Sequence, residues 1–123
     1  MELKLLINSL QPSQLYISQG KLSNIQQWFN PMDLSNFDPI PIKQHNGMYV
    51  ITDGHTRVTA AILAGLDTVP IVWDNDDLDM EAYGICINWC LEEGVNSPQD
   101  LVDRIIPQQQ YELLWNKRCE DNL

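Results

Sequence analysis

The first third of the chain shows apolar residues in short runs and at helical spacing. Residues 3–8 are mostly apolar and predict a first strand. Pro12 disfavours helix after that strand, so residues 11–18 are predicted to form an extended loop. Apolar residues then recur at helical spacing over residues 21–29, which predicts the first helix.

The middle of the chain predicts a hairpin followed by a helix and a further strand. Two β-rich runs, residues 40–44 and 48–51, flank an Asn-Gly dipeptide, which is typical of tight hairpin turns. Helical spacing follows over residues 58–64, and residues 69–73 predict another strand. Up to this point the elements follow the order β-α-β-β-α-β, which indicates a small mixed sheet with two helices.

Proline and glycine mark two boundaries within this region. Pro41 has no backbone N–H, so its strand is predicted to lie at a sheet edge or to place Pro41 where no donor is needed. Gly65 follows the helix of residues 58–64 and is a candidate for the left-handed residue that ends it. Both predictions concern backbone hydrogen bonding rather than side-chain packing.

The remainder of the chain predicts helices. They cover residues 78–93, a short stretch from 96 or 97 to 104, and a last segment that opens at Pro107. The fold class is therefore predicted to be α+β, with a single domain over residues 1–123. Within it, a core of residues 1–76 is expected to carry a packed helical extension, residues 77–123, because about forty residues alone would make a marginal core.

The charge of the chain limits the partners it can bind. Seven Lys and Arg residues against seventeen Asp and Glu residues give a net charge of −10 at pH 7 and an isoelectric point near 4.3. Duplex nucleic acid and anionic membranes attract cationic proteins, so both are predicted to repel the chain as a whole. A small anionic ligand stays compatible with this charge, because one local cationic pocket can oppose the global field.

The N-terminal segment and the cysteines favour a cytoplasmic protein. The start of the chain lacks the basic region and the cleavage site of a signal peptide, and no apolar run reaches the length of a membrane span. Three cysteines do not suggest a disulfide framework. Cys86 and Cys90 are spaced to share one helix face as buried, unreactive side chains, and Cys119 lies in a polar segment.

The segment Asp53-Gly54-His55-Thr56-Arg57 carries the most informative chemistry. A strand ends there, a glycine allows a tight turn, and a helix begins. The first amides of a helix have no internal partners and the helix dipole adds positive charge, so such a start can bind an anion. The candidate phosphate ligands are Gly54, His55, Thr56 and Arg57. Asp53 and His55 are the candidate catalytic residues: one could hold Mg²⁺ or act as a base, and the other could donate to phosphate or move a proton.

Structural explanations for the same residues stay open. Asp is a favoured helix N-cap residue, and in that role Asp53 would bind no ligand. Arg57 could simply pair with one of the many carboxylates of the chain. The hydrogen bonds that each side chain makes in the structure separate these roles.

The same stretch resembles the ParB/sulfiredoxin-like family of nucleotide-binding domains. The resemblance covers roughly residues 4–73 and consists of an ordered set of motifs. They are Gln11–Leu15, Pro39–Ile42, Tyr49–Arg57, Ala60-Ala61 and Ala64–Val72. The shared pattern is a strand, a Gly-x-x-Arg turn, a helix with small residues, Gly-Leu, Val-Pro and a strand. The chain is similar to a small stand-alone bacterial member of this family.

The resemblance implies a nucleotide-binding function. In the family, the positions that match Gly54, His55, Thr56 and Arg57 bind nucleotide phosphates. The implied cofactors are Mg²⁺, which would lie near Asp53, with ATP, ADP or CTP. ParB proteins bind and hydrolyse CTP while loading onto DNA, sulfiredoxins use ATP to repair an oxidised cysteine of peroxiredoxins, and some members are free-serine kinases.

Differences from these relatives reduce the number of activities that the resemblance implies for this chain. His55 stands where sulfiredoxins carry their catalytic cysteine, so that thiol chemistry has no nucleophile. The residues after the matching region are too few for the helix-turn-helix and dimerisation domains of a partition protein. The loop after the first strand offers Tyr16 in place of the ParB arginine, and residues 3–32 contain no acid to match the proposed catalytic glutamate of the serine kinases. Asp53 could serve instead.

An acidic run and four tryptophans complete the candidate features. The acidic residues are Asp74, Asp76, Asp77, Asp79 and Glu81. They could bind a divalent ion or a basic protein partner, or they could form a solvated loop and helix start, where carboxylates suit the helix dipole. The tryptophans predicted to be core anchors rather than base-stacking residues are Trp28, Trp73, Trp89 and Trp115.

Three functional hypotheses follow from the sequence. The first is a nucleotide- or phosphate-binding protein, with phosphotransfer or NTP hydrolysis at the turn of residues 53–57 as the reaction if it is an enzyme. The second is a non-catalytic acidic interaction protein that keeps the fold and binds a basic partner. The third is a ParB-like nuclease, for which the sequence offers no duplex-binding surface.

Overall fold

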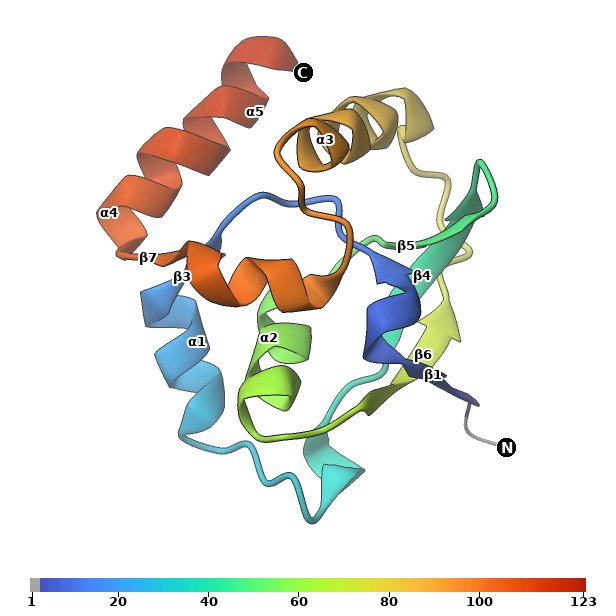
Figure 1. The fold of residues 1–123 in the computed structure, drawn as a ribbon, viewed down its shortest axis with the longest axis vertical. Coiled ribbons are helices and arrows are strands. Elements are labelled where there is room, and N and C mark those ends of the chain that lie inside the picture. Colours follow the sequence, from blue (N-terminus) through green and yellow to red (C-terminus); the bar gives the residue numbers. More distant parts are fainter. Residues whose placement is uncertain (1–2) are drawn as a thin grey trace.

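The N-terminal part of the protein forms short strands and one helix. The computed structural model describes residues 3–123 and is shown in Figure 1. This part contains β1 (Leu3–Leu6), the 3₁₀ turn η1 (Ile7–Ser9), β2 (Leu10–Gln11), β3 (Ile17–Ser18), α1 (Gln19–Gln26) and the 3₁₀ turn η2 (Leu34–Asn36). α1 begins earlier than the apolar spacing predicts, because the Ser18 hydroxyl accepts a hydrogen bond from the Lys21 N–H and caps the helix.

The central sheet has five strands of mixed direction. Its remaining strands are β4 (Ile40–His45), β5 (Met48–Ile51) and β6 (Thr68–Trp73), and the order across the sheet is β1-β6-β4-β5-β2. β4 runs parallel to β6 and β2 parallel to β5, whereas the β1–β6 and β4–β5 pairs are antiparallel. A separate parallel pair joins β3 to β7 (Ile105–Ile106). The predicted α+β fold with a small mixed sheet is confirmed.

The β4–β5 hairpin has the tight turn that the Asn-Gly dipeptide predicts. Asn46 and Gly47 both have positive φ, at 51° and 78°, as a type I′ turn requires. Pro41, however, lies in β4 at the centre of the sheet, so the edge position that was one alternative for its strand is wrong. The Pro41 carbonyl accepts a hydrogen bond from the Thr52 N–H beyond the end of β5, and the Thr52 carbonyl accepts one from the Tyr83 hydroxyl instead of from residue 41.

The helix after β5 ends at the glycine that the sequence singles out. α2 (His55–Leu63) leads from β5 back to β6. Two hydrogen bonds close its last turn. The Leu66 N–H donates to the Ala61 carbonyl, and the Gly65 N–H donates to the Ile62 carbonyl. With Gly65 at φ 87°, this is a Schellman ending, in which a left-handed residue stops the helix.

The C-terminal part is helical and packs against α1 and α2. It consists of α3 (Met80–Glu92), the 3₁₀ helix η3 (Pro98–Arg104), and a last segment built of α4 (Gln108–Tyr111), the π turn η4 (Glu112–Asn116) and α5 (Lys117–Asn122). In Figure 1 the three parts of this last segment run on as one rod. No helix within residues 3–123 is long and apolar enough to cross a membrane.

Two clusters of buried side chains hold these layers together. The first lies between the sheet and α2 and includes Ile42 and Val58. The second joins the loop after β2 to α1 and the C-terminal helices, and includes Leu15, Cys90 and Trp115. α2 contributes residues to both clusters. The start of α2 is therefore fixed between the sheet and the C-terminal helices.

The four tryptophans divide into two buried or packed rings and two exposed rings. Trp115 is buried, and Trp89 packs against it edge to face, with 6.0 Å between ring centroids. Trp28 and Trp73, however, are 46% and 45% exposed, so the prediction that all four are core anchors is wrong for these two. Each of the two exposed rings lines a hollow in the surface.

The cysteines lie in or against the second cluster. Cys86 and Cys90 are buried as predicted, and burial raises the pKa of their thiols to about 11 and about 12. Both thiols therefore stay protonated at neutral pH and are poor nucleophiles. Cys119 packs against the same cluster, and burial raises its pKa as well.

Candidate functional site

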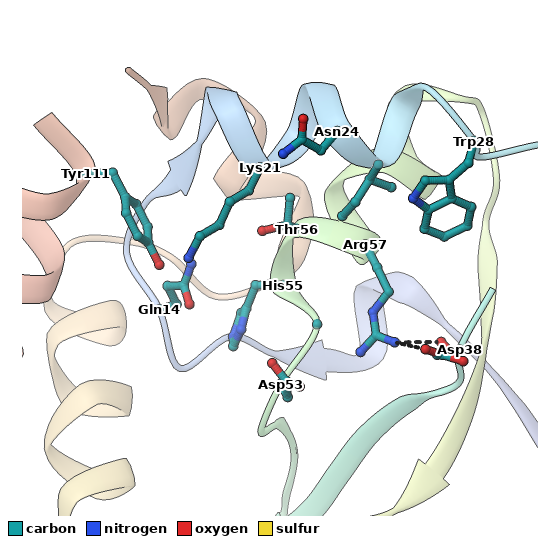
Figure 2. A pocket seen from close by; sticks show the side chains of 12 residues that line it. Gln14, Lys21, Asn24, Trp28, Asp38, Asp53, His55, Thr56, Arg57 and Tyr111 are labelled. Atoms are coloured by element: carbon teal, nitrogen blue, oxygen red, sulfur yellow. Dashed lines mark hydrogen bonds and ion pairs between the residues drawn. The ribbon is translucent and has the colours of Figure 1, made fainter. Parts of the chain in front are cut away.

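A cleft of about 560 Å³ opens at the start of α2. Three segments form it: α1 on one side, the turn of residues 53–57 that leads into α2, and Tyr111 of the last helix at one end, as Figure 2 shows. All five residues that the sequence singles out at this turn line the cleft. The structure therefore brings the candidate phosphate ligands and the candidate catalytic residues together at one surface hollow.

Gly54 gives the turn its shape. It is the N-cap residue of α2 and has φ 87°, a left-handed backbone conformation that favours glycine. A Cβ atom at this position would lie 2.5 Å from Nη2 of Arg57, so the guanidinium fills the space that any other residue would need. Among the described residues no side chain caps α2, so Asp53 does not have the capping role that the sequence left open.

Arg57 places a nearly buried cation in the cleft. Only 16% of its side chain is exposed, and Nη1 donates a hydrogen bond of 3.2 Å to the Asp38 carbonyl. The Asp38 carboxylate lies 3.8 Å from the same nitrogen, but that side chain is 90% exposed, so the ion pair is loose and screened by solvent. The other guanidinium donors form no hydrogen bond with any part of the chain that the structure describes. They are free to bind an anion.

Lys21 supplies a second cation that the sequence alone did not single out. Its Nζ lies 4.9 Å from the centre of the Tyr111 ring, at the other end of the cleft from Arg57, as Figure 2 shows. Asn24 of α1 and Trp28, in the turn just after the end of α1, also line the cleft. The spacing of these three residues is helical, so the shared face could have been recognised from the sequence once this helix was predicted.

His55 is largely enclosed by its own protein. The residue is 5% exposed, and Nε2 accepts a hydrogen bond of 2.9 Å from the Ser13 N–H, which leaves the ring proton on Nδ1. Burial lowers the pKa of His55 from 6.5 to about 4, although the negative charge of Asp53 opposes the shift. The imidazole is therefore neutral at pH 7 and holds the loop after β2 against the turn. Its ligand-binding and catalytic roles stay predictions.

Asp53 is exposed at the turn, where it lines the cleft. Among residues 3–123 no group of three or more His, Cys, Asp or Glu side chains is arranged to hold a metal ion. Mg²⁺, however, is commonly bound by one or two carboxylates together with substrate phosphates and water. Asp53 is therefore able to hold Mg²⁺ only together with a phosphate ligand that supplies further oxygen atoms to the metal.

Comparison with known proteins adds to the description of the fold. The sequence matches no family model and no curated protein. A solved structure of protein Atu1540 from Agrobacterium tumefaciens is similar with a TM-score of 0.52 and 14% identity, over 82% of this chain and 61% of that one. The C-terminally truncated chromosome-partitioning protein ParB from Caulobacter crescentus, solved with the centromeric parS site, shows a TM-score of 0.47 and 20% identity, over 89% of this chain and 66% of that one.

These similarities concern the fold alone. The mixed sheet with the helix after the Gly-x-x-Arg turn agrees with the α+β core that the sequence resemblance implies, and 82% of the chain shares the fold of the Agrobacterium protein. The chain spans 61% of the length of the Agrobacterium protein and 66% of the length of the Caulobacter protein. Identities of 14% and 20% carry no information on activity, so function has to be argued from the cleft itself.

Proposed function

We propose that the cleft at the start of α2 binds the phosphate groups of a nucleotide. The observation that carries this proposal is the position of Arg57, whose enclosed guanidinium lies against Gly54 with most of its donors unused. Arg57 faces the same hollow as the first amides of α2, which have no partner inside the helix. An enclosed cation next to unpaired N–H groups favours a phosphate over a neutral ligand.

Each predicted phosphate ligand has a distinct part in this proposal. Gly54 permits the turn, and the backbone N–H groups of His55, Thr56 and Arg57 face the anion. Thr56 adds its hydroxyl and Arg57 its guanidinium. His55 contributes through its backbone only, because its ring already accepts a hydrogen bond from Ser13.

The length of the cleft favours a ligand with more than one phosphate group. Lys21 and Arg57 lie at different ends of the cleft, so one phosphate group would leave one of these cations unused. Trp28, half exposed at the rim beside Arg57, offers a flat face on which a nucleobase can stack. A nucleoside di- or triphosphate would use both cations and the indole.

Asp53 is the residue that would hold Mg²⁺ in this site, together with oxygens of the bound phosphates. The metal would offset the negative charge that the phosphates bring near an acidic protein. A phosphotransfer or NTP hydrolysis reaction needs the same arrangement, with Asp53 next to the phosphates. Release of inorganic phosphate from ATP or CTP would identify hydrolysis, and formation of ADP or CDP without free phosphate, in the presence of an acceptor, would identify phosphotransfer. Either activity is expected to be lost in Asp53→Asn.

Calorimetric titration with Mg²⁺ and a panel of ATP, ADP, CTP and GTP tests the proposal. We expect saturable one-to-one binding of at least one nucleotide, weakened at least about tenfold by Arg57→Ala, because a charge-assisted hydrogen bond contributes roughly 1.5–3 kcal/mol. Lys117→Ala removes a cation from the exposed last helix and is the control. Absence of binding to the whole panel, or an unchanged affinity in Arg57→Ala, would refute the proposal.

A further inference from the structure

A second hollow lies between the end of β6 and the start of α3. It is an open groove of about 640 Å³. Its apolar walls come from Pro41 of β4, Trp73 at the end of β6, Leu78 of the connection to α3, and Tyr83 of α3 itself. Figure 1 shows this connection, drawn in yellow, leaving β6 and rising to α3. The groove shares Asp53 with the candidate cleft, but no Lys or Arg lines it.

The groove exposes aromatic surface that the fold does not use. Trp73 is 45% exposed and lies 6.0 Å, centroid to centroid, from the ring of Tyr49, which is itself 37% exposed. Large aromatic rings grouped at the surface in this way are typical of protein interfaces, where tryptophan and tyrosine are the commonest anchors.

The charged residues that line the groove are all acidic, and Lys43 is a nearby cation that acts on Asp74. Asp53, Asp74 and Asp76 line the groove. Asp74 accepts hydrogen bonds of 2.6 Å from the Thr52 hydroxyl and 3.0 Å from the Asp76 N–H, which hold its pKa below the usual range and fix its place. The Asp76 side chain is exposed and forms no hydrogen bond within the described part of the chain. An aromatic ring among carboxylates favours a cationic occupant over an anionic or a neutral one.

We propose that this groove is a docking surface for a basic peptide segment of a protein partner. A Lys or Arg side chain of the segment lies against the exposed face of Trp73, and neighbouring cations of the segment face Asp74 and Asp76. A nucleic acid is repelled by these carboxylates, and a second copy of this chain carries the same charge of −10. The proposal does not rest on nucleotide binding: the two hollows share Asp53 alone, and the residues that hold the peptide, Trp73, Asp74 and Asp76, lie outside the candidate cleft.

Fluorescence anisotropy with a labelled oligo-arginine peptide tests this assignment, without nucleotide. We expect saturable binding at low salt that weakens as salt rises, and no binding of an oligo-glutamate peptide of equal length. Trp73→Ala is expected to weaken binding about tenfold. Trp28→Ala is the matched control, because it removes an indole of nearly equal exposure, 46% against 45%, from outside the groove.

A second pair of variants separates the groove from the overall charge. Asp76→Asn is expected to weaken peptide binding about threefold, whereas Asp103→Asn, which removes the same charge from an exposed position of η3, leaves it unchanged. The Asp76 side chain forms no hydrogen bond within the described chain, so Asp76→Asn is expected to fold. The comparison with Asp103→Asn therefore still tests the proposal when Trp73→Ala does not fold.

Three results would overturn the proposal. The first is no binding of the oligo-arginine peptide. The second is equal weakening within either pair of variants, which would show attraction to net charge rather than to the groove. The third is a dimer in sedimentation velocity that Trp73→Ala dissociates, because the occupant would then be a second copy of the chain.

Discussion

The Arg57 guanidinium occupies the space that a side chain at Gly54 would need, with Nη2 2.5 Å from the position of a Cβ atom. Gly54 also has a left-handed φ of 87° at the N-cap of α2. Glycine therefore suits this position for two reasons: its backbone adopts the left-handed conformation without strain, and a Cβ atom would force the end of the Arg57 side chain to move. The Gly-x-x-Arg pattern acts as one unit, in which the turn determines where the charge lies.

Replacing this glycine is expected to separate stability from ligand binding. Gly54 and Gly65 both have φ 87°, but nothing lies within 4 Å of a Cβ at Gly65. Gly54→Ala and Gly65→Ala should each lower the free energy of unfolding by about 1–2 kcal/mol, because alanine is strained in this conformation. Only Gly54→Ala displaces Arg57, so only this variant should weaken nucleotide affinity, by about tenfold. Urea unfolding and calorimetry measure the two effects. Equal affinities in the two variants would contradict the role given to Arg57.

Lys21 is expected to matter more for a longer phosphate chain. It lies beside Tyr111, at the end of the cleft away from Arg57. Lys21→Gln should therefore weaken ATP binding about tenfold and AMP binding less, because AMP cannot reach both cations. Lys117→Gln, whose exposed side chain pairs with Asp121 on the last helix, serves as the control. The same loss for ATP and AMP would show that Lys21 contributes only general attraction.

Acid is expected to destabilise the fold through His55. Burial lowers its pKa from 6.5 to about 4, so below pH 6.5 the unfolded chain binds a proton that the folded chain does not. The free energy of unfolding is therefore unaffected by this group above pH 6.5 and falls by about 3 kcal/mol as the pH drops to 4. Many carboxylates titrate in the same range, so the comparison is with His55→Gln, which keeps an acceptor for the Ser13 N–H. An identical pH dependence of urea unfolding in both proteins would argue against this account.

Glu93 connects the C-terminal helices whose Tyr111 closes the cleft. Its Oε1 lies 2.7 Å from Nη2 of Arg104 and its Oε2 lies 3.1 Å from Nη1 of Arg118. Glu93→Gln should lower the free energy of unfolding by about 1 kcal/mol, because these pairs are partly exposed and individually weak. The neighbouring Glu92→Gln should change it by less than about 0.5 kcal/mol. Thermal unfolding that shifts equally for both variants would show that Glu93 has no special role.

Local patterns predicted the parts of the site that are local in the chain. The turn at Gly54, the hairpin at Asn46 and the helix end at Gly65 each depend on neighbouring residues, and the structure confirms all three. Lys21 belongs to the same cleft but comes from another helix, and no short-range signal connects it to Arg57. The exposure of Trp73 was missed for the same reason, because burial depends on which elements pack over a side chain.

Amide chemical shifts during titration with ATP and Mg²⁺ test the central claim most directly, because they locate the ligand on the chain. The account predicts saturable shifts of the amides at residues 54–58 and around Lys21, lost in Arg57→Gln. Shifts confined to the groove around Trp73, or no shifts with any nucleotide of the panel, would contradict it.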